Sequence, residues 1–259
     1  MNGQRCLLCR GERRESLKFR TLLSPDDPPG LCRECRAGLL PIAPEHRCRG
    51  CGRDLRRIES RYVERSLCID CRRWRSSGKT GSYGHNVALY SYNETMKEII
   101  NLFKFRGDAL LAEAFRREFR TAGRRLIGKN PGSRLRRLLP GRLHPAPTLI
   151  VPIPLSRARQ FARGFNQAEL LANLIGESLT HALIRPDDGR KQSKKTRSER
   201  LSSEENPYLL NPQAGDAVRG RNILLIDDIY TTGATLHRAA LALEAAKPER
   251  IDSLTLIHG

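Results

Sequence analysis

Apolar residues along the chain lie in short runs whose spacing predicts alternating strands and helices. Four consecutive aliphatic residues at 223–226 indicate a strand buried on both faces, as in the middle of a parallel sheet. Further strands are predicted at 87–92, 148–151 and 250–257. Apolar residues at helical spacing predict helices after Asn93, after Asp108, over about 168–183, and from Leu236 towards Lys247. This alternation predicts an α/β fold with a parallel sheet flanked by helices.

Two long polar segments separate these elements. Residues 128–147 are rich in Gly, Pro and Arg, which is typical of a connecting loop. Residues 185–206 are polar and charged, which fits a flap able to close over an anionic ligand. The same composition fits a plain surface loop, and the pattern leaves both interpretations open.

Candidate chemistry follows the buried strand at 223–226. Asp227 and Asp228 come directly after it, and a Thr/Gly-rich turn opens the next predicted helix; the turn comprises Thr231, Thr232, Gly233, Ala234 and Thr235. Ligands of α/β sheets bind at the carboxyl ends of strands, beside helix N-termini that offer N–H groups to anions. The turn suits a phosphate, and the acids suit ribose hydroxyls or a metal ion. Helix capping is the alternative role of the acids. The pattern resembles the motif of type I phosphoribosyltransferases that binds phosphoribosyl pyrophosphate (PRPP).

A second candidate segment follows the strand at 148–151. Two prolines rigidify the turn there, which comprises Val151, Pro152, Ile153 and Pro154. Arg163 and Gly164 come shortly afterwards. An arginine beside a rigid turn suits a pyrophosphate, and a glycine allows close backbone approach. An ordinary strand–helix connection is the alternative.

All eight cysteines fall into four C-x-x-C pairs within residues 1–79. In a chain without an expected secretory signal, such pairs favour zinc over disulfides. Two pairs complete a tetrahedral site of four thiolates with no open position, so the zinc would be structural. Sequential pairing gives one site of Cys6, Cys9, Cys32 and Cys35 and another of Cys48, Cys51, Cys68 and Cys71. Pairing the first pair with the third is the alternative. We expect a double zinc ribbon over 1–79 and an α/β domain over 80–259.

The net charge of +19 is unevenly distributed, with excesses of +9 in residues 1–79 and +9 in 97–142. Basic excess suits nucleic acid, an anionic membrane surface or a polyphosphate, while a coding bias towards Arg explains it equally. One predicted helix carries a row of arginines that suits either phosphate contacts or a solvated face: Arg116, Arg117, Arg120, Arg124 and Arg125. Since no apolar run approaches 18 residues and no charged start precedes an apolar segment, we expect no membrane span, no signal peptide and a cytoplasmic protein.

These motifs together resemble the ComF family of competence-associated proteins, and the resemblance covers nearly the whole chain. It depends on the cysteine pairs, on Val-Pro-Ile-Pro-Leu at 151–155, on Arg-Gly-Phe-Asn-Gln at 163–167, on Gln192, Thr196, Arg197 and Arg200, and on the acidic turn at 227–235. The resemblance implies a double zinc ribbon fused to a type I phosphoribosyltransferase domain that binds PRPP with Mg²⁺. It also implies a role in DNA uptake, beside a competence helicase and single-stranded DNA, in the cytoplasm or at the inner face of the membrane.

The resemblance implies roles for particular residues. Asp227 and Asp228 would hold the ribose hydroxyls, 231–235 would surround the 5′-phosphate, and 151–155 would meet the pyrophosphate. Purine-salvage members of the superfamily carry an Asp at the position of Thr231, so the loop is more similar to those of orotate- and amido-type enzymes. Cys6 belongs to a zinc pair and leaves no N-terminal cysteine nucleophile. Two hypotheses stay open: a PRPP-binding DNA-uptake factor, and an active phosphoribosyltransferase with an unknown nitrogen acceptor.

Overall fold

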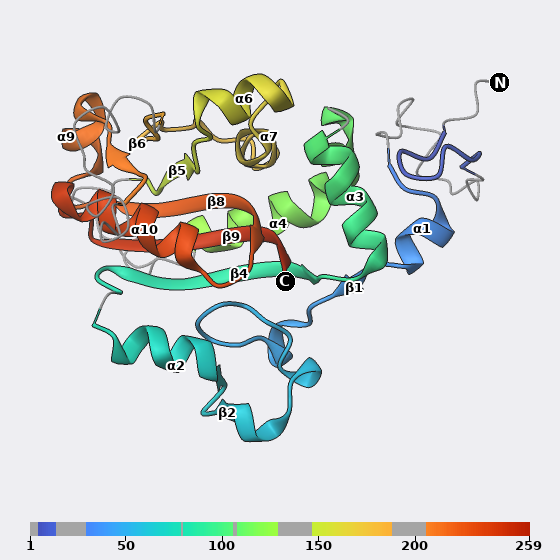
Figure 1. Cartoon of the computed structure of the whole chain (residues 1–259), viewed down its shortest axis with the longest axis horizontal. Helices are drawn as coiled ribbons and strands as arrows, with labels where there is room; N and C mark the ends of the chain where they lie inside the picture. Colours follow the sequence, from blue (N-terminus) through green and yellow to red (C-terminus); the bar gives the residue numbers. More distant parts are fainter. Residues whose placement is uncertain (1–4, 14–29, 79, 106–107, 129–146, 188–205) are drawn as a thin grey trace, which may run out of the picture.

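A five-stranded sheet forms the centre of the molecule (Figure 1). The computed structural model describes residues 5–13, 30–78, 80–105, 108–128, 147–187 and 206–259. The sheet has the order β1 (Leu40–Pro41), β4 (Tyr83–Ser91), β9 (Arg250–His258), β8 (Asn222–Tyr230) and β5 (Leu149–Pro152). The last four strands are parallel, and β1 pairs antiparallel with β4. The predicted α/β class and all four predicted strands are confirmed.

Strand β8 lies between β9 and β5 and is buried on both faces, as its run of aliphatic residues predicted. Leu224 and Ile226 belong to one hydrophobic core, whereas Ile223 and Leu225 belong to another. Successive side chains of a strand point to opposite faces, so the sheet separates the two cores. The aliphatic side chains of 223–226 are therefore buried only because helices cover both faces of the sheet.

Each face of the sheet has its own helical cover. One core includes residues of α3 (Glu94–Phe105), η5 (Ala109–Phe115), α4 (Arg116–Gly128) and α7 (Gln167–Asn173). The other includes residues of α10 (Ala234–Leu243) and η9 (Glu244–Ala246). Helix α3 begins as predicted, because Asn93 Oδ1 accepts a hydrogen bond from the Met96 N–H at 2.9 Å.

The remaining described elements are short. Those of the cysteine region are α1 (Arg33–Ala37), η2 (Pro44–His46), η3 (Leu55–Arg57), η4 (Ser60–Tyr62), β2 (Val63–Glu64), β3 (Leu67–Cys68) and α2 (Ile69–Ser76). Those of the second half are α6 (Arg157–Arg163), β6 (Leu183–Ile184), β7 (Leu209–Leu210), η8 (Pro212–Ala214) and α9 (Gly215–Val218). Most of the predicted loop at 128–147 and of the flap at 185–206, including Gln192, Thr196, Arg197 and Arg200, lies outside the described residues.

Two predicted helices differ from the structure. The helix expected over 168–183 ends at Asn173, since Gly176 adopts a left-handed φ of 80° and the chain then runs beside β5, where the Thr180 N–H donates to the Ile150 carbonyl at 2.8 Å. The helix expected after Asp108 starts as the 3₁₀ segment η5. The Asp108 side chain does not cap it and instead pairs with Arg10 at 2.7 Å.

Candidate functional site

The carboxyl end of β8 presents the two acidic residues on opposite faces of the sheet. Asp228 is buried on the face of Leu224 and Ile226, and Asp227 is half-buried on the other face. The Asp228 N–H donates to Asp227 Oδ1 at 2.9 Å, which fixes one carboxylate against the backbone of the other. Both side chains line one cavity at this edge of the sheet.

Asp228 forms a largely buried ion pair with Lys104 from the last turn of α3. Lys104 Nζ lies 2.6 Å from Asp228 Oδ2, and the two side chains are 17% and 9% exposed. Apart from this ion pair, Asp228 Oδ2 has no hydrogen-bond partner among the described residues. A single cation therefore compensates a carboxylate that burial would otherwise destabilise.

Asp227 has an electrostatically unfavourable environment. Burial raises the pKa of the Asp227 carboxyl well above its usual value, and the adjacent Asp228 carboxylate raises it further. The Asp228 N–H and the more distant Lys104 charge oppose this increase. A carboxylate in this state is stabilised by an incoming cation or by hydroxyl donors, which favours a ligand-binding role over helix capping.

The Thr/Gly turn connects β8 to the N-terminus of α10. Gly233 is the N-cap residue with a left-handed φ of 83°, and no side chain caps the helix from this position. A Cβ atom at Gly233 would lie 2.6 Å from Tyr230 Cζ, so a side chain does not fit there. Thr231 and Thr235 line the cavity together with the acids. The Ala234 N–H donates to Thr232 Oγ1 at 3.4 Å, and the N–H groups of a helix N-terminus beside threonine hydroxyls suit an anion such as a phosphate.

The proline turn and α6 also contribute to the lining of this cavity. Ile153 and Pro154 line the cavity, whereas Val151 and Pro152 lie within β5 and are buried. Asn166 Nδ2 donates to the Ile153 carbonyl at 3.0 Å and holds the turn in place. From α6, Arg163 lines the cavity as well. The structure thus places Ile153 and Pro154 of the predicted turn in the same cavity as the two predicted acids.

Sequence reasoning singled out none of three polar residues of this cavity, although one of them, Arg185, begins the predicted flap at 185–206. Lys104 is placed by α3, Arg185 follows β6, and Tyr208 precedes β7. Arg185 Nη1 lies 3.5 Å from Tyr208 Oη, with the guanidinium 5.5 Å from the ring centroid. No local pattern marks these residues, because only the tertiary fold brings them together. The cavity therefore has two acidic side chains and four cationic ones, the latter being Lys104, Arg159, Arg163 and Arg185.

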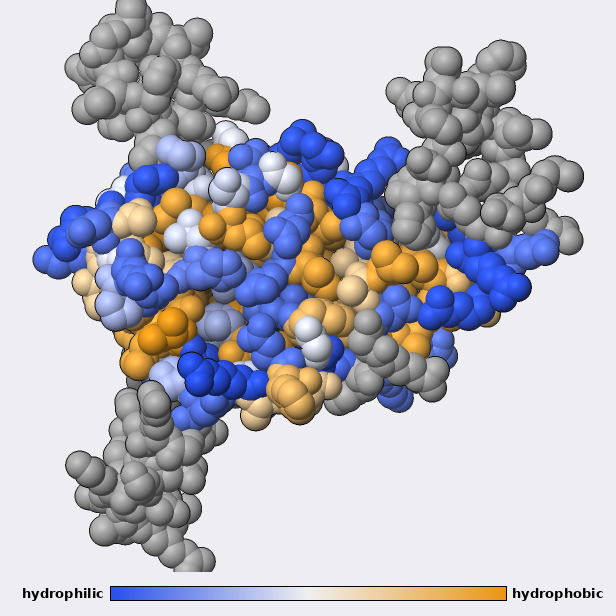
Figure 2. Space-filling model, turned by 90° about the horizontal axis from the view of Figure 1, so that it is seen from above, coloured by the Kyte–Doolittle hydropathy of each residue, from blue (hydrophilic) through white to orange (hydrophobic). Residues whose placement is uncertain are grey.

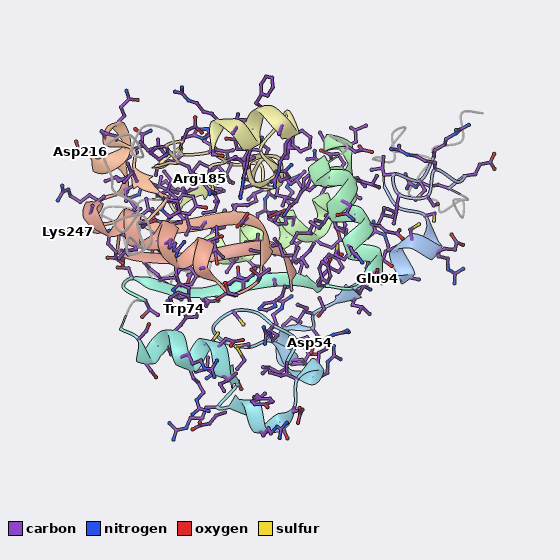
Figure 3. The ribbon with its side chains drawn as sticks, viewed as in Figure 1. Asp54, Trp74, Glu94, Arg185, Asp216 and Lys247 are labelled. Carbon is purple, nitrogen blue, oxygen red and sulfur yellow. The ribbon has the colours of Figure 1, made fainter. Side chains whose placement is uncertain are left out.

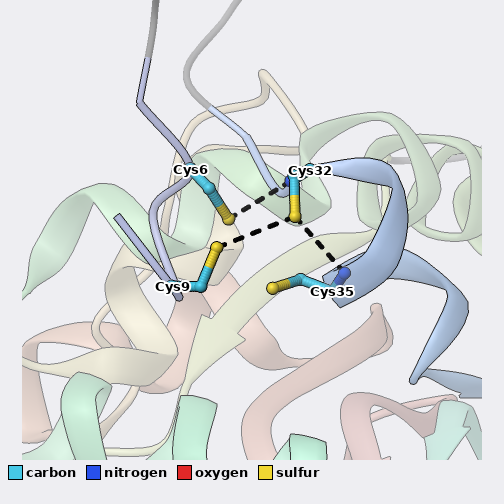
Figure 4. A group of neighbouring side chains, drawn as sticks. All are labelled: Cys6, Cys9, Cys32 and Cys35. Carbon is cyan, nitrogen blue, oxygen red and sulfur yellow. Dashed lines mark hydrogen bonds between the residues drawn. The ribbon is translucent and has the colours of Figure 1, made fainter. Parts of the chain in front are cut away.

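The first cysteine cluster is assembled from the first two pairs (Figure 4). Cys9 Sγ lies 3.8 Å from Cys32 Sγ, and Cys6 Sγ accepts the Cys32 N–H at 3.2 Å. In a tetrahedral zinc site with Zn–S bonds of ~2.3 Å, neighbouring sulfurs lie about 3.8 Å apart. The donors therefore fit zinc, and the sequential pairing is confirmed.

The second cluster, Cys48, Cys51, Cys68 and Cys71, is buried throughout. Its sulfurs lie 3.6 Å apart for Cys48 and Cys71 and 3.7 Å apart for Cys51 and Cys68, which also fits zinc. The two clusters contribute to the two different cores of the sheet. Figure 1 shows α1 of the first cluster beside α3, and α2 of the second cluster on the other side of β4.

The arginine row lies on α4, as its spacing predicted. Arg117, Arg120, Arg124 and Arg125 are exposed. Arg116 is half-buried and pairs with Glu113 of the preceding segment η5. This exposure is compatible both with a solvated face and with phosphate contacts. Among the described residues, no helix is long and apolar enough to cross a membrane.

Comparisons with known proteins support the sequence-based resemblance. Residues 162–259 match the family model of the phosphoribosyl transferase domain. Competence protein ComFC of Bacillus subtilis is 38% identical over 98% of this chain and 94% of its own length. Competence protein ComFC of Streptococcus pneumoniae is 31% identical over 98% of this chain and its full length. The DNA utilization protein YhgH of Escherichia coli is 26% identical over 83% of this chain and 91% of its own length.

Proposed function

Because this chain belongs to the ComF family of competence proteins, we propose that its cavity binds PRPP with Mg²⁺ and that the protein acts in competence-related DNA uptake. The observation that carries the proposal is the composition of one cavity. Two carboxylates, a threonine-rich helix N-terminus and four cationic side chains meet there. A ribose with a phosphate at one end and a pyrophosphate at the other requires these three kinds of partner.

Each part of the cavity suits one part of PRPP. The N–H groups and hydroxyls of 231–235 would bind the 5′-phosphate. Asp227 and Asp228 would accept hydrogen bonds from the ribose hydroxyls. Arg159 and Arg163 would bind the pyrophosphate beside the Ile153–Pro154 turn.

The acidic side of the cavity also fits Mg²⁺. This ion takes oxygen ligands and is commonly held by one or two carboxylates together with substrate phosphates. The Asp227 carboxyl, whose pKa is raised by burial and by the adjacent Asp228 carboxylate, gains from such a cation. Mg²⁺ would neutralise negative charge on the pyrophosphate, while Lys104 would keep its ion pair with Asp228.

Calorimetric titration with PRPP and Mg²⁺ tests the binding proposal. The double variant Asp227→Asn/Asp228→Asn should weaken binding more than about 100-fold, since hydrogen bonds to charged groups contribute ~1.5–3 kcal/mol each. Asp216→Asn is the matched control, because Asp216 is an exposed acid on α9 that does not line the cavity (Figure 3). Absence of binding by the wild type would reject the proposal.

An active transferase is the second candidate function. Transfer would break the bond between ribose C1 and pyrophosphate, which leaves with the electron pair, and would join C1 to an acceptor nitrogen. Arg159 and Arg163 would stabilise the leaving group. Thr231 stands where salvage members carry an acid, so this loop supplies no general base to the acceptor. Pyrophosphate release with ammonia or another nitrogen acceptor would select this function, whereas binding without release selects a PRPP-responsive uptake factor.

The DNA-uptake part of the proposal predicts contact with single-stranded DNA. Helix α6 carries Arg157, Arg159 and Arg163 and no acidic residue. Phe161 in the same helix is 93% exposed, the highest value among the exposed large hydrophobic residues described. Figure 2 shows the face on the α6 side as a mixture of hydrophilic and hydrophobic residues. Arginines beside an exposed aromatic ring suit phosphates and stacked bases of a single strand.

Fluorescence anisotropy with a labelled single-stranded oligonucleotide distinguishes the candidate surfaces. Phe161→Ala should weaken binding about tenfold, because base stacking contributes ~1–3 kcal/mol per base. Leu241→Ala is the control, since Leu241 is also exposed (56%) but lies on α10. Loss of binding only on neutralising Arg117, Arg120 and Arg124 would assign the contact to α4 instead. No DNA binding at any salt concentration would reject this part of the proposal.

A further inference from the structure

The second cysteine cluster is connected to the phosphate turn by one side chain, Trp74 of α2. Trp74 Nε1 donates a hydrogen bond to the Thr232 carbonyl at 2.8 Å. The indole ring also stacks on the imidazole of His237 in α10, with centroids 3.8 Å apart and planes 9° from parallel. Figure 3 shows Trp74 between α2 and the sheet. The two contacts join residues that lie 158 positions or more apart in the sequence.

The hydrogen bond from Trp74 fixes the orientation of the Thr232–Gly233 peptide within the 231–235 turn. A trans peptide is planar, and its carbonyl and N–H point in opposite directions. With the Thr232 carbonyl held by Trp74, the Gly233 N–H is directed away from the indole. Gly233 begins α10 at a left-handed φ that other residues rarely adopt. The Thr232–Gly233 peptide is therefore a place where a small rotation would change the N–H groups offered to a phosphate.

Helix α2, which carries Trp74, is attached through the cysteine cluster and through two partly exposed ion pairs, Asp70 with Arg53 and Arg72 with Glu64. Cys71 is the only buried residue among Ile69–Ser76 and lies one helical turn before Trp74. Cys68 is the N-cap residue of the same helix. The cluster is itself attached to β4, since Asn86 Nδ2 donates to the Cys51 carbonyl at 2.9 Å. An ion bound by the four sulfurs would therefore fix the position from which Trp74 reaches the turn.

We propose that Trp74 is a positioning residue that couples zinc at the second cluster to phosphate binding at the 231–235 turn. The proposal rests on the proposed binding of PRPP. Zinc and PRPP then favour the same position of Trp74, and each increases the affinity for the other by the same factor. Trp74 touches neither ligand and acts through the Thr232–Gly233 peptide.

The substitution Trp74→Phe separates the hydrogen bond from the ring contact. Phenylalanine keeps an aromatic ring against His237 but has no N–H for Thr232. Because Thr232 is exposed, water can solvate its carbonyl in the variant. The loss is therefore that of one ordinary hydrogen bond, which corresponds to about fivefold weaker PRPP binding. The melting temperature should fall by no more than about 2–4 °C, the effect of one such hydrogen bond, and the zinc content should remain that of the wild type. Arg73→Ala is the matched control, since Arg73 is an exposed neighbour on α2.

Zinc competition gives a second test with the wild-type chain. A chromophoric chelator should remove one of the two zinc ions less readily when PRPP and Mg²⁺ are present, and Trp74→Phe should reduce this protection. Trp74 is the chain's single tryptophan, so its fluorescence should also change when the turn binds PRPP.

The outcomes separate this inference from the proposed function. Failure of the wild type to bind PRPP in calorimetry would overturn both. Binding of PRPP with equal affinity by wild type and Trp74→Phe would overturn the coupling alone. If Trp74→Phe does not fold, the wild-type zinc competition still decides, because equal zinc retention with and without PRPP would refute the coupling.

Discussion

Replacement of Lys104 by methionine should destabilise the protein through Asp228. Methionine matches the length of the lysine side chain and removes its charge. The variant leaves a carboxylate that is 9% exposed without its cation. Removing one partner of a fully buried ion pair costs about 3–5 kcal/mol. Because the Lys104 side chain is 17% exposed, water reaches part of the site, and we expect a loss of about 2–3 kcal/mol.

Thermal and chemical unfolding measure this effect. At ~2–4 °C per kcal/mol for a domain of this size, the melting temperature should fall by about 4–12 °C. Lys97→Met is the matched control on the same helix, because the Lys97–Glu94 pair is 51% and 85% exposed and solvent screening leaves it little effect on stability. The double variant Lys104→Met/Asp228→Asn should recover much of the loss. Equal destabilisation by Lys97→Met and Lys104→Met, or no recovery in the double variant, would refute the reasoning.

Three further predictions follow from the cavity and the clusters. Asp227→Asn should increase the free energy of unfolding relative to wild type, because burial and Asp228 raise the pKa of the Asp227 carboxyl in the folded state. The difference should be absent at low pH and should grow as the pH rises from the unfolded-state pKa to the folded-state pKa of Asp227. Chemical denaturation between pH 4 and 8 checks this, and a constant difference would contradict it. Gly233→Ala should cost at least ~1 kcal/mol more than Gly78→Ala in thermal melts, since both glycines have positive φ but only Gly233 is crowded. Cys51→Ser should halve the zinc content from two ions per chain and lower the melting temperature; unchanged zinc by atomic absorption would exclude Cys51 as a ligand.

The parts of the fold that depend on local pattern could be predicted from the sequence. The strand at 223–226, the Asn93 cap and the cysteine pairs carry their signals within a few residues, and the structure confirms all three. The predicted helix over 168–183 is too long, because the apolar spacing that continues to Leu183 conceals the stop at Gly176, after which Thr180 pairs with β5.

The candidate site was predictable only in part for the same reason. Asp227 and Asp228 lie at the end of a strand that its aliphatic run makes recognisable, and the threonine turn follows that strand, so sequence alone placed them together. The Lys104–Asp228 pair and the Trp74–Thr232 hydrogen bond join distant segments whose residue types are ordinary for their helices. Contacts of this kind depend on how helices pack on the sheet, which no short motif encodes.

Calorimetry with PRPP and Mg²⁺ tests the central claim most directly. We predict saturable binding of one PRPP per chain by the wild type and by Asp216→Asn, and loss of that binding in Asp227→Asn/Asp228→Asn. Unfolding curves of all three proteins must show folded chains. Absence of heat with the wild type, or equal affinity in the double variant, would show that the acidic end of β8 is not a PRPP site.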